Sequence, residues 1–137
     1  MDVENHVYPT ASRVEALMAD DSGDPVVMVN LLKFRPKAVY PDGRPSDLTG
    51  RQAYDLYAAA MQKVIEENGG RLLFGGDVAS LVIGEVGDLW DTCVLVEYPS
   101  AAAFAAIVTS PEVTEIGVHR AAGLEGQLLI RAKQLAL

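Results

Sequence analysis

The sequence predicts an α+β fold, a ferredoxin-like βαββαβ protomer with an extra N-terminal helix. Two observations carry the protomer prediction. Apolar strand-like segments alternate with stretches at helical spacing, and after a first helix the order is strand, helix, strand, strand, helix, strand. Each strand also has one wholly apolar face, which in a two-layer domain packs against helices.

Length and composition describe one domain with no affinity for polyanions. The 137 residues are half hydrophobic and 22% charged, as in one globular domain, with 1–24 as a helical extension and 25–137 as the core. The net charge of −8 opposes nucleic acid and anionic membranes. The start lacks a signal-peptide pattern, apolar runs are too short for a membrane span, and Cys93 has no partner cysteine. We therefore expect a cytoplasmic protein.

The first half of the chain is expected to hold two helices and one strand. Residues 10–20 predict a short helix, opened by Pro9 and Thr10 and ended by a polar run. Residues 26–34 are mostly apolar and predict a strand. After a loop at 35–49, apolar residues at helical spacing predict a helix from about Thr49 to Asn68, which the following glycines end.

The second half is expected to supply three strands and two helices. Residues 71–85 fit either two short strands or one long strand with a glycine bulge at 75–76, and we prefer the bulge. A third strand follows at 91–98 and a last strand at 124–131. Between them lie helices at 101–109 and from Ser110 to about Ala122, the second with Ser110 as N-cap and Pro111 at its first position.

The polar residues of the strands predict a covered space. Asn30, Glu97 and Gln127 lie on strand faces that are otherwise apolar. The purely apolar faces are expected to meet the helices, and the faces with polar exceptions to meet a second copy of the chain, because monomers rarely expose such large apolar patches. Asn30 would then point into a cavity or satisfy a neighbour across the sheet, since burying an unpaired amide costs about 1–3 kcal/mol.

Several segments together resemble the domain-of-unknown-function family 1330. They are residues 26–34, the helix containing Tyr57, Gly69-Gly70-Arg71, Glu97-Tyr98-Pro99-Ser100 with Ala103-Phe104, and Ser110-Pro111-Glu112 followed by His119-Arg120-Ala121. The resemblance covers nearly the whole chain and implies the dimeric α+β barrel superfamily, in which two ferredoxin-like protomers pair sheet to sheet. It implies no reaction, because that superfamily includes cofactor-independent monooxygenases, lactone isomerases and haem-dependent chlorite-degrading enzymes.

No metal or cofactor site is expected. The two histidines and one cysteine form no paired ligand motif, and His119 would be a poor axial ligand for haem. Residues 20–24 imitate the start of a calcium loop, but Pro25 occupies the place of the required glycine.

The last helix carries the clearest candidate residues. Arg120 is the cation on its apolar side, so it either binds an anionic group or makes a structural contact, for which Glu97 is the candidate partner. His119, at the helix end, is either a general acid or base or an exposed histidine. Tyr57 is either a proton donor in the cavity or a core aromatic with a hydrated hydroxyl.

Two functions fit these residues. The first is a cofactor-independent enzyme, monooxygenase- or isomerase-like, acting on a small acidic or enolisable organic molecule in the barrel cavity. In it Arg120 holds an anionic group, Asn30 orients a carbonyl with Glu97 nearby, and Tyr57 or His119 moves a proton. The second is a non-catalytic small-molecule-binding or stress-related homodimer, in which Asn30 and Arg120 serve structure. A flavin- or haem-using oxidoreductase is weaker for want of ligands.

The loop at 35–49 is expected to form a mobile rim of the cavity. It holds three prolines and few apolar anchors.

Overall fold

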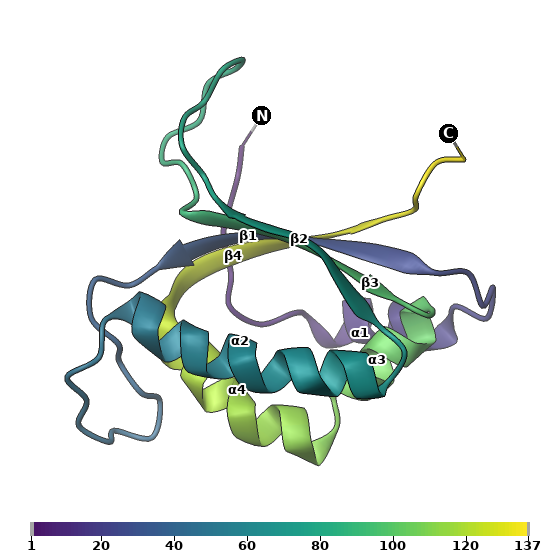
Figure 1. Ribbon diagram of the computed structural model, residues 1–137, viewed down its shortest axis with the longest axis horizontal. Helices are drawn as coiled ribbons and strands as arrows, with labels where there is room; N and C mark the ends of the chain where they lie inside the picture. Colours follow the sequence, from purple (N-terminus) through teal and green to yellow (C-terminus); the bar gives the residue numbers. More distant parts are fainter. Residues whose placement is uncertain (1, 137) are drawn as a thin grey trace.

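The computed structural model describes residues 2–136, which fold as four helices beneath one four-stranded antiparallel sheet (Figure 1). In chain order the elements are α1 (Ala11–Ala19), β1 (Val26–Phe34), α2 (Gly50–Glu67), β2 (Arg71–Asp77), β3 (Thr92–Tyr98), α3 (Ala101–Val108), α4 (Pro111–Gly123) and β4 (Leu124–Ala132). The strand order is β2-β3-β1-β4, and every neighbouring pair is antiparallel. This order and the βαββαβ succession confirm the predicted ferredoxin-like protomer.

Local signals place the helix starts. Thr49 and Gln52 form a capping box at the start of α2, in which each side chain bonds the backbone of the other. The Ser110 side chain accepts from the backbone N–H of Val113, and Pro111 occupies the first turn of α4. These caps explain why the predicted helix starts agree with the structure.

Strand β2 is shorter than predicted. It ends at Asp77, and its register shift lies between Leu72 and Phe74 rather than at 75–76. Residues 78–91, which we call the arm, leave the sheet and return to it, with Val78 N–H donating to the carbonyl of Asp91 at the base. The apolar run that suggested a longer strand has no partner strand there, because β3 begins only at Thr92.

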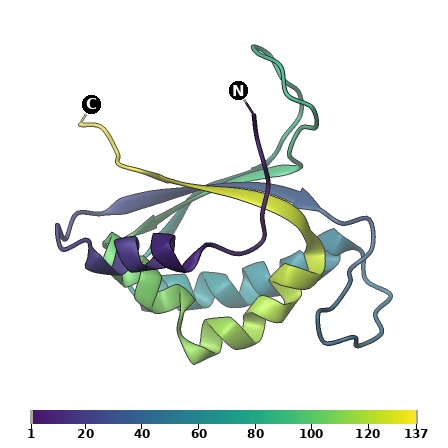
Figure 2. The same cartoon turned by 180° about the vertical axis from the view of Figure 1, so that it is seen from behind.

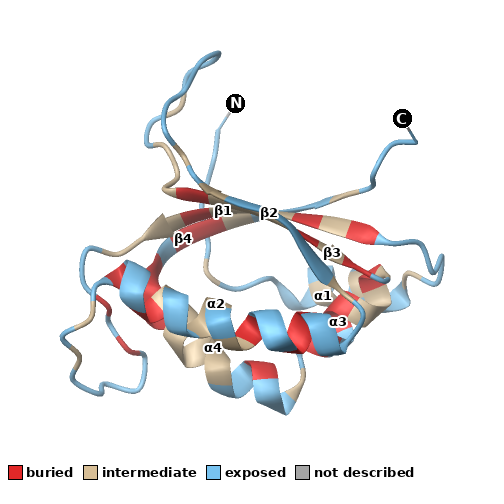
Figure 3. Cartoon of the chain, in the orientation of Figure 1, coloured by how far each residue is buried: buried red, intermediate tan, exposed pale blue. Residues whose placement is uncertain are grey.

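The two faces of β1 are reversed relative to the prediction. Met28 and Leu32 are 2% and 0% exposed and face the helices, so Asn30 between them also faces the helices. The wholly apolar side of β1, represented by Val29, lies on the opposite face, which we call the open face because no helix covers it (Figure 3). The reversal is tolerated because the amide of Asn30 finds hydrogen-bond partners within the fold.

The core lies between the helix-facing side of the sheet and the helices. One cluster joins the sheet to α2, α3 and α4 through buried side chains that include Met28, Met61, Val96 and Phe104. On the other side of the sheet, the arm and both chain ends project into solvent (Figure 2). The described residues form one sheet and one helical layer, and the single domain stays a prediction.

The loop at 35–49 has more apolar anchors than its composition indicated. Ala38 and Tyr40 are 9% and 6% exposed and pack with Ala53 and Ala122. Backbone bonds also join Ala38 to Leu48 and Val39 to Ala122. The loop is thus fixed to the α2–α4 side of the molecule, with Ala38 and Tyr40 as its buried anchors.

No single helix among residues 2–136 has the length and apolarity of a membrane span, and α3 with α4 reaches that length only across a 75° bend.

Candidate functional site

A cleft lies between α2 and the β2–β3 side of the sheet. It consists of an inner cavity of about 190 Å³ and an outer cavity of about 340 Å³. The two cavities adjoin each other, since Tyr54, Ala58, Gly75 and Val94 line both. The cleft is therefore covered by the protomer's own helix and does not require the open face.

Three tyrosines line the inner cavity. Tyr54 and Tyr57 come from α2, with their ring centroids 5.5 Å apart, and Tyr98 comes from the end of β3. None of their hydroxyls has a hydrogen-bond partner within residues 2–136, whereas every sealed polar side-chain atom in this range has one. The three hydroxyls must therefore open onto accessible space, and the inner cavity is the space that these residues share.

Burial keeps these hydroxyls protonated. It raises the pKa of Tyr54, Tyr57 and Tyr98 above the ordinary value, and the neighbouring tyrosines raise the pKa of Tyr54 and Tyr98 further. The positive charge of Arg120 opposes part of this effect on the pKa of Tyr54 and Tyr57. At neutral pH the cavity thus presents neutral O–H groups, which donate hydrogen bonds and are poor bases.

Alkaline titration should reveal the three buried tyrosines. Since their folded pKa values are raised, their contribution to stability is complete below the unfolded value of about 10 and is lost as pH rises through the folded values. In an ultraviolet absorbance titration, we expect Tyr54, Tyr57 and Tyr98 to ionise only as the protein unfolds. Ionisation of these three tyrosines near pH 10 with the fold intact would contradict this assignment.

Asn30 lies at the floor of the inner cavity with its amide fully engaged. Its Nδ2 donates to the carbonyls of Met28 at 3.2 Å and Val94 at 3.1 Å, and its Oδ1 accepts from Nε2 of Gln127 at 2.8 Å. Both amide hydrogens are used, so only a remaining lone pair of Oδ1 can serve a ligand. The sequence left two alternatives for Asn30, an amide that points into a cavity or one that bonds neighbours across the sheet. The structure contains the bonds to the neighbours.

Arg120 is linked to Asn30 through Gln127. The guanidinium donates to Oε1 of Gln127 at 2.7 Å and to the carbonyl of Val7. Gln127 is 8% exposed, so the Arg120–Gln127–Asn30 chain runs through the interior from α4 to the cavity floor. Arg120 itself does not line either cavity.

Glu97, one candidate for a structural partner of Arg120, does not contact it. Glu97 lies opposite Val27 in the β1–β3 register, so its side chain is on the open face. There it accepts from Nε of Arg71 at 3.0 Å. Periodicity in the sequence shows on which face of its helix Arg120 lies and on which face of its strand Glu97 lies. It does not show that these two faces are on opposite sides of the sheet.

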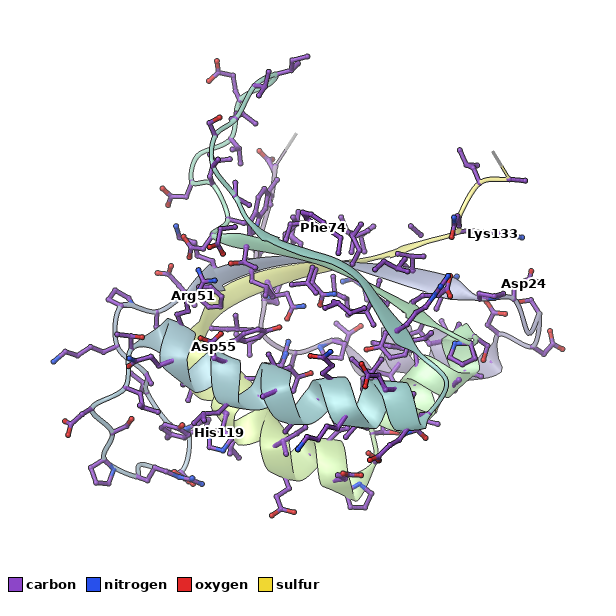
Figure 4. All side chains as sticks on the ribbon, in the orientation of Figure 1. Asp24, Arg51, Asp55, Phe74, His119 and Lys133 are labelled. Atoms are coloured by element: carbon purple, nitrogen blue, oxygen red, sulfur yellow. The ribbon has the colours of Figure 1, made fainter. Side chains whose placement is uncertain are left out.

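His119 lies outside the cleft. Its Nδ1 is 2.7 Å from the hydroxyl oxygen of Tyr40, and the two rings pack edge to face. Figure 4 shows His119 in the helical layer, away from Arg51 at the mouth of the outer cavity. Of the five candidate residues, Asn30 and Tyr57 therefore meet in one cavity, Arg120 reaches it through Gln127, and His119 and Glu97 lie elsewhere.

An ion pair that the sequence did not indicate crosses the outer cavity. Arg51 of α2 donates to Oδ1 of Asp77 in β2 at 2.7 Å, and Thr92 donates to the same oxygen. These bonds hold the pKa of Asp77 below its usual value. Asp55 lines the same cavity, so two carboxylates accompany one guanidinium there. No spacing signal could have paired residues 51 and 77, because only the tertiary fold joins them.

The residues described, 2–136, include no group of three histidine, cysteine, aspartate or glutamate side chains placed to hold a metal ion.

The chain is similar to proteins whose structures are known. A protein of unknown function from Rhodopseudomonas palustris is 35% identical, with 98% of this chain and 100% of that chain covered and a TM-score of 0.86. Its methylated form is 37% identical, with 96% of each chain covered and a TM-score of 0.87. More distant is a dimeric protein of unknown function and ferredoxin-like fold from Bacteroides fragilis, 14% identical, with 80% of this chain and 96% of that chain covered and a TM-score of 0.44.

Family comparison agrees with the resemblance seen in the sequence. No curated protein gives a significant match. Residues 45–133, most of the chain, match the family described as Domain of unknown function (DUF1330). The chain belongs to this family.

Proposed function

We propose that the inner cavity binds a small neutral organic molecule through its oxygen atom, and that the protein is a cofactor-independent enzyme acting on an enolisable carbonyl compound there. The observation that carries this proposal is the convergence of three unpartnered tyrosine hydroxyls on one mainly apolar cavity. Neutral donors of this kind bind a carbonyl oxygen, and bind it more strongly as negative charge develops on it.

The surroundings favour a neutral ligand over a free carboxylate. Arg120 is already engaged by Gln127 and the Val7 carbonyl. At the outer cavity, Asp55 and Asp77 outnumber Arg51, and the whole chain carries a net charge of −8. The enolisable class of substrate therefore fits the cleft better than the acidic class.

The tyrosines and Asn30 have different parts in this proposal. Tyr57 and Tyr54 donate to the substrate oxygen and stabilise its enolate. The free lone pair of Asn30 Oδ1 accepts from a hydroxyl or enol of the substrate, and the Arg120–Gln127–Asn30 chain fixes the amide in the orientation that leaves this lone pair free. An isomerase-like proton shift also needs a base that takes the proton from the carbon beside the carbonyl and returns it elsewhere on the substrate, and in this proposal that base is the carboxylate of Asp55 in the adjoining outer cavity.

A non-catalytic binding protein is the second candidate. The observation that favours it is that no carboxylate or imidazole lines the inner cavity among residues 2–136. In that case the same hydroxyls hold a ligand without moving its proton. Binding and proton exchange must therefore be measured separately.

Cyclohexanone is a suitable probe, because it is neutral and has one carbonyl and exchangeable hydrogens beside it. We expect Tyr57→Phe to weaken its binding roughly three- to tenfold, as for loss of one hydrogen bond. Protein-observed NMR titration measures the affinity, and deuterium uptake by the probe measures catalysis. The matched control is Tyr8→Phe, since Tyr8 is 65% exposed.

The outcomes separate the two candidates. Binding with protein-dependent deuterium uptake supports the enzyme, and binding without uptake supports the non-catalytic protein. Equal affinities of wild type, Tyr57→Phe and Tyr8→Phe would remove the inner cavity from both proposals.

We also propose that the protein is a homodimer joined through its open faces. The centre of this face is apolar, with Val29 flanked by Leu95 on β3 and Ile130 on β4, and Phe74, which is 54% exposed, adds a ring above the sheet (Figure 4). Its ends are polar, with Lys33 beside Asp91 and Arg71 beside Glu97. An apolar centre within a polar rim is the usual composition of a protein interface.

A further inference from the structure

The arm, residues 78–91, carries the most exposed large hydrophobic side chains in the described chain. Val82 and Ile83 are 88% and 90% exposed, and Leu81 before them is 44% exposed. Three consecutive exposed aliphatic residues at the end of a projecting segment form an unfavourable surface for a protein that stays alone in water.

The arm projects from the open side of the sheet. Figures 1 and 2 show it rising away from the helices, on the side where both chain ends also lie. Its base is fixed by the Val78–Asp91 backbone bond, by Asp91 N–H donating to the carbonyl of Leu32, and by Trp90 donating to Oδ1 of Asn5. A fixed base and an apolar end describe a docking element rather than a fraying loop.

The length of the arm exceeds the gap that a second copy would leave. From residue 78 to the turn at Gly84, which has φ +105°, an extended chain reaches up to about 20 Å. Two sheets packed face to face lie about 10 Å apart. An arm rising from one sheet would therefore pass the sheet of the second copy and bring its apolar end alongside the flank of that copy.

We infer that the arm is a clasp that holds the second copy of this chain, with residues 81–83 packing against the side of the partner. The inference rests on the proposed homodimer and adds the arm to the open face as an independent part of the interface. By two-fold symmetry, each protomer would both give an arm and receive one.

Charge argues against a lipid surface as the occupant. The arm contains Glu85, Asp88 and Asp91 but no lysine or arginine, and the chain has a net charge of −8. Anionic bilayers would repel such a segment. A second copy has the same net charge. However, its open face is a large apolar surface, and this face lies on the same side of the sheet as the arm. The surface of a bilayer presents no such apolar face to the arm.

The test replaces the apolar end of the arm and measures dimer affinity. We expect Val82→Ser with Ile83→Ser to raise the dimer dissociation constant about tenfold or more in sedimentation equilibrium. The control is Val39→Ser, because Val39 is 59% exposed in the loop at 35–49, on the helical side. Circular dichroism should show unchanged secondary structure, since the arm lies outside every helix and strand.

Two results would overturn the inference, and they differ in what else they affect. A wild type that is monomeric at micromolar concentration removes both the dimer and the clasp. A dimeric wild type whose dissociation constant is unchanged by the double substitution removes the clasp alone. A photo-crosslinker placed at position 83 gives the same distinction directly, because intermolecular products support the clasp and exclusively intramolecular products contradict it.

Discussion

Arg120→Met is expected to lower the free energy of unfolding by roughly 2–3 kcal/mol, which for a chain of this size is a fall of roughly 5–10 °C in melting temperature. The substitution keeps most of the side-chain volume and removes the donors to Gln127 and to the Val7 carbonyl. Gln127 is 8% exposed, so its Oε1 would be left without a donor in the interior. An unsatisfied buried acceptor costs more than the net value of the bond itself.

The matched control is Arg131→Met. Arg131 also pairs through its guanidinium, with Asp20 at 2.9 Å, but its side chain is 47% exposed. Exposed ion pairs contribute at most about 1 kcal/mol, so this variant should unfold close to wild type in urea titrations. Adding Gln127→Met to Arg120→Met should not recover the loss, because Oδ1 of Asn30 then also loses its donor. An Arg120→Met protein as stable as the Arg131→Met protein would show that the buried chain contributes nothing.

The elements of the fold could be predicted because their signals are local. The Thr49 and Ser110 caps and the helical spacing of apolar residues act within a few residues of each other, and the helix starts agree with the structure. The end of β2 could not be predicted in this way. Residues 78–83 are as apolar as a strand, but whether a neighbouring strand is there to pair with them is decided by distant parts of the chain.

The candidate site was predictable only in part, for the same reason. An amide within an apolar strand marked Asn30 as unusual, but the partners that satisfy it, Val94 and Gln127, are 64 and 97 residues away. Helical spacing placed Tyr57 on a buried face, which is where it lies. Tyr98 was not among the predicted site residues, because nothing in a single strand shows that its end lines a cavity against α2.

The placement of His119 and Glu97 outside the cleft has a common physical origin. Helix and strand periodicity show which residues share a face, but they do not show what packs against that face. His119 meets Tyr40 from the loop at 35–49, and Glu97 meets Arg71 across the open face. Both partners are brought in by tertiary structure, so each residue is engaged outside the cleft.

Val29→Lys is expected to weaken the proposed dimer about a hundredfold or more, so that monomer predominates at micromolar concentration. Val29 lies at the middle of the open face, paired with Leu95 on one side and Ile130 on the other. An ammonium group enclosed there has no carboxylate opposite it in the strand register. Removing water from an unpaired charge costs several kcal/mol of free energy. In the monomer the same side chain extends into water, so the fold should persist.

Light scattering across a dilution series measures this effect, with Leu56→Lys as the matched control. Leu56 is 49% exposed on α2, in the helical layer rather than on the open face, so its replacement adds the same charge without entering the proposed interface. If both variants dissociate equally, the added charge acts through the net charge of the protein and not through the face. If Val29→Lys remains as dimeric as wild type, the two protomers do not meet through their sheets, and the apolar centre of the open face requires another partner.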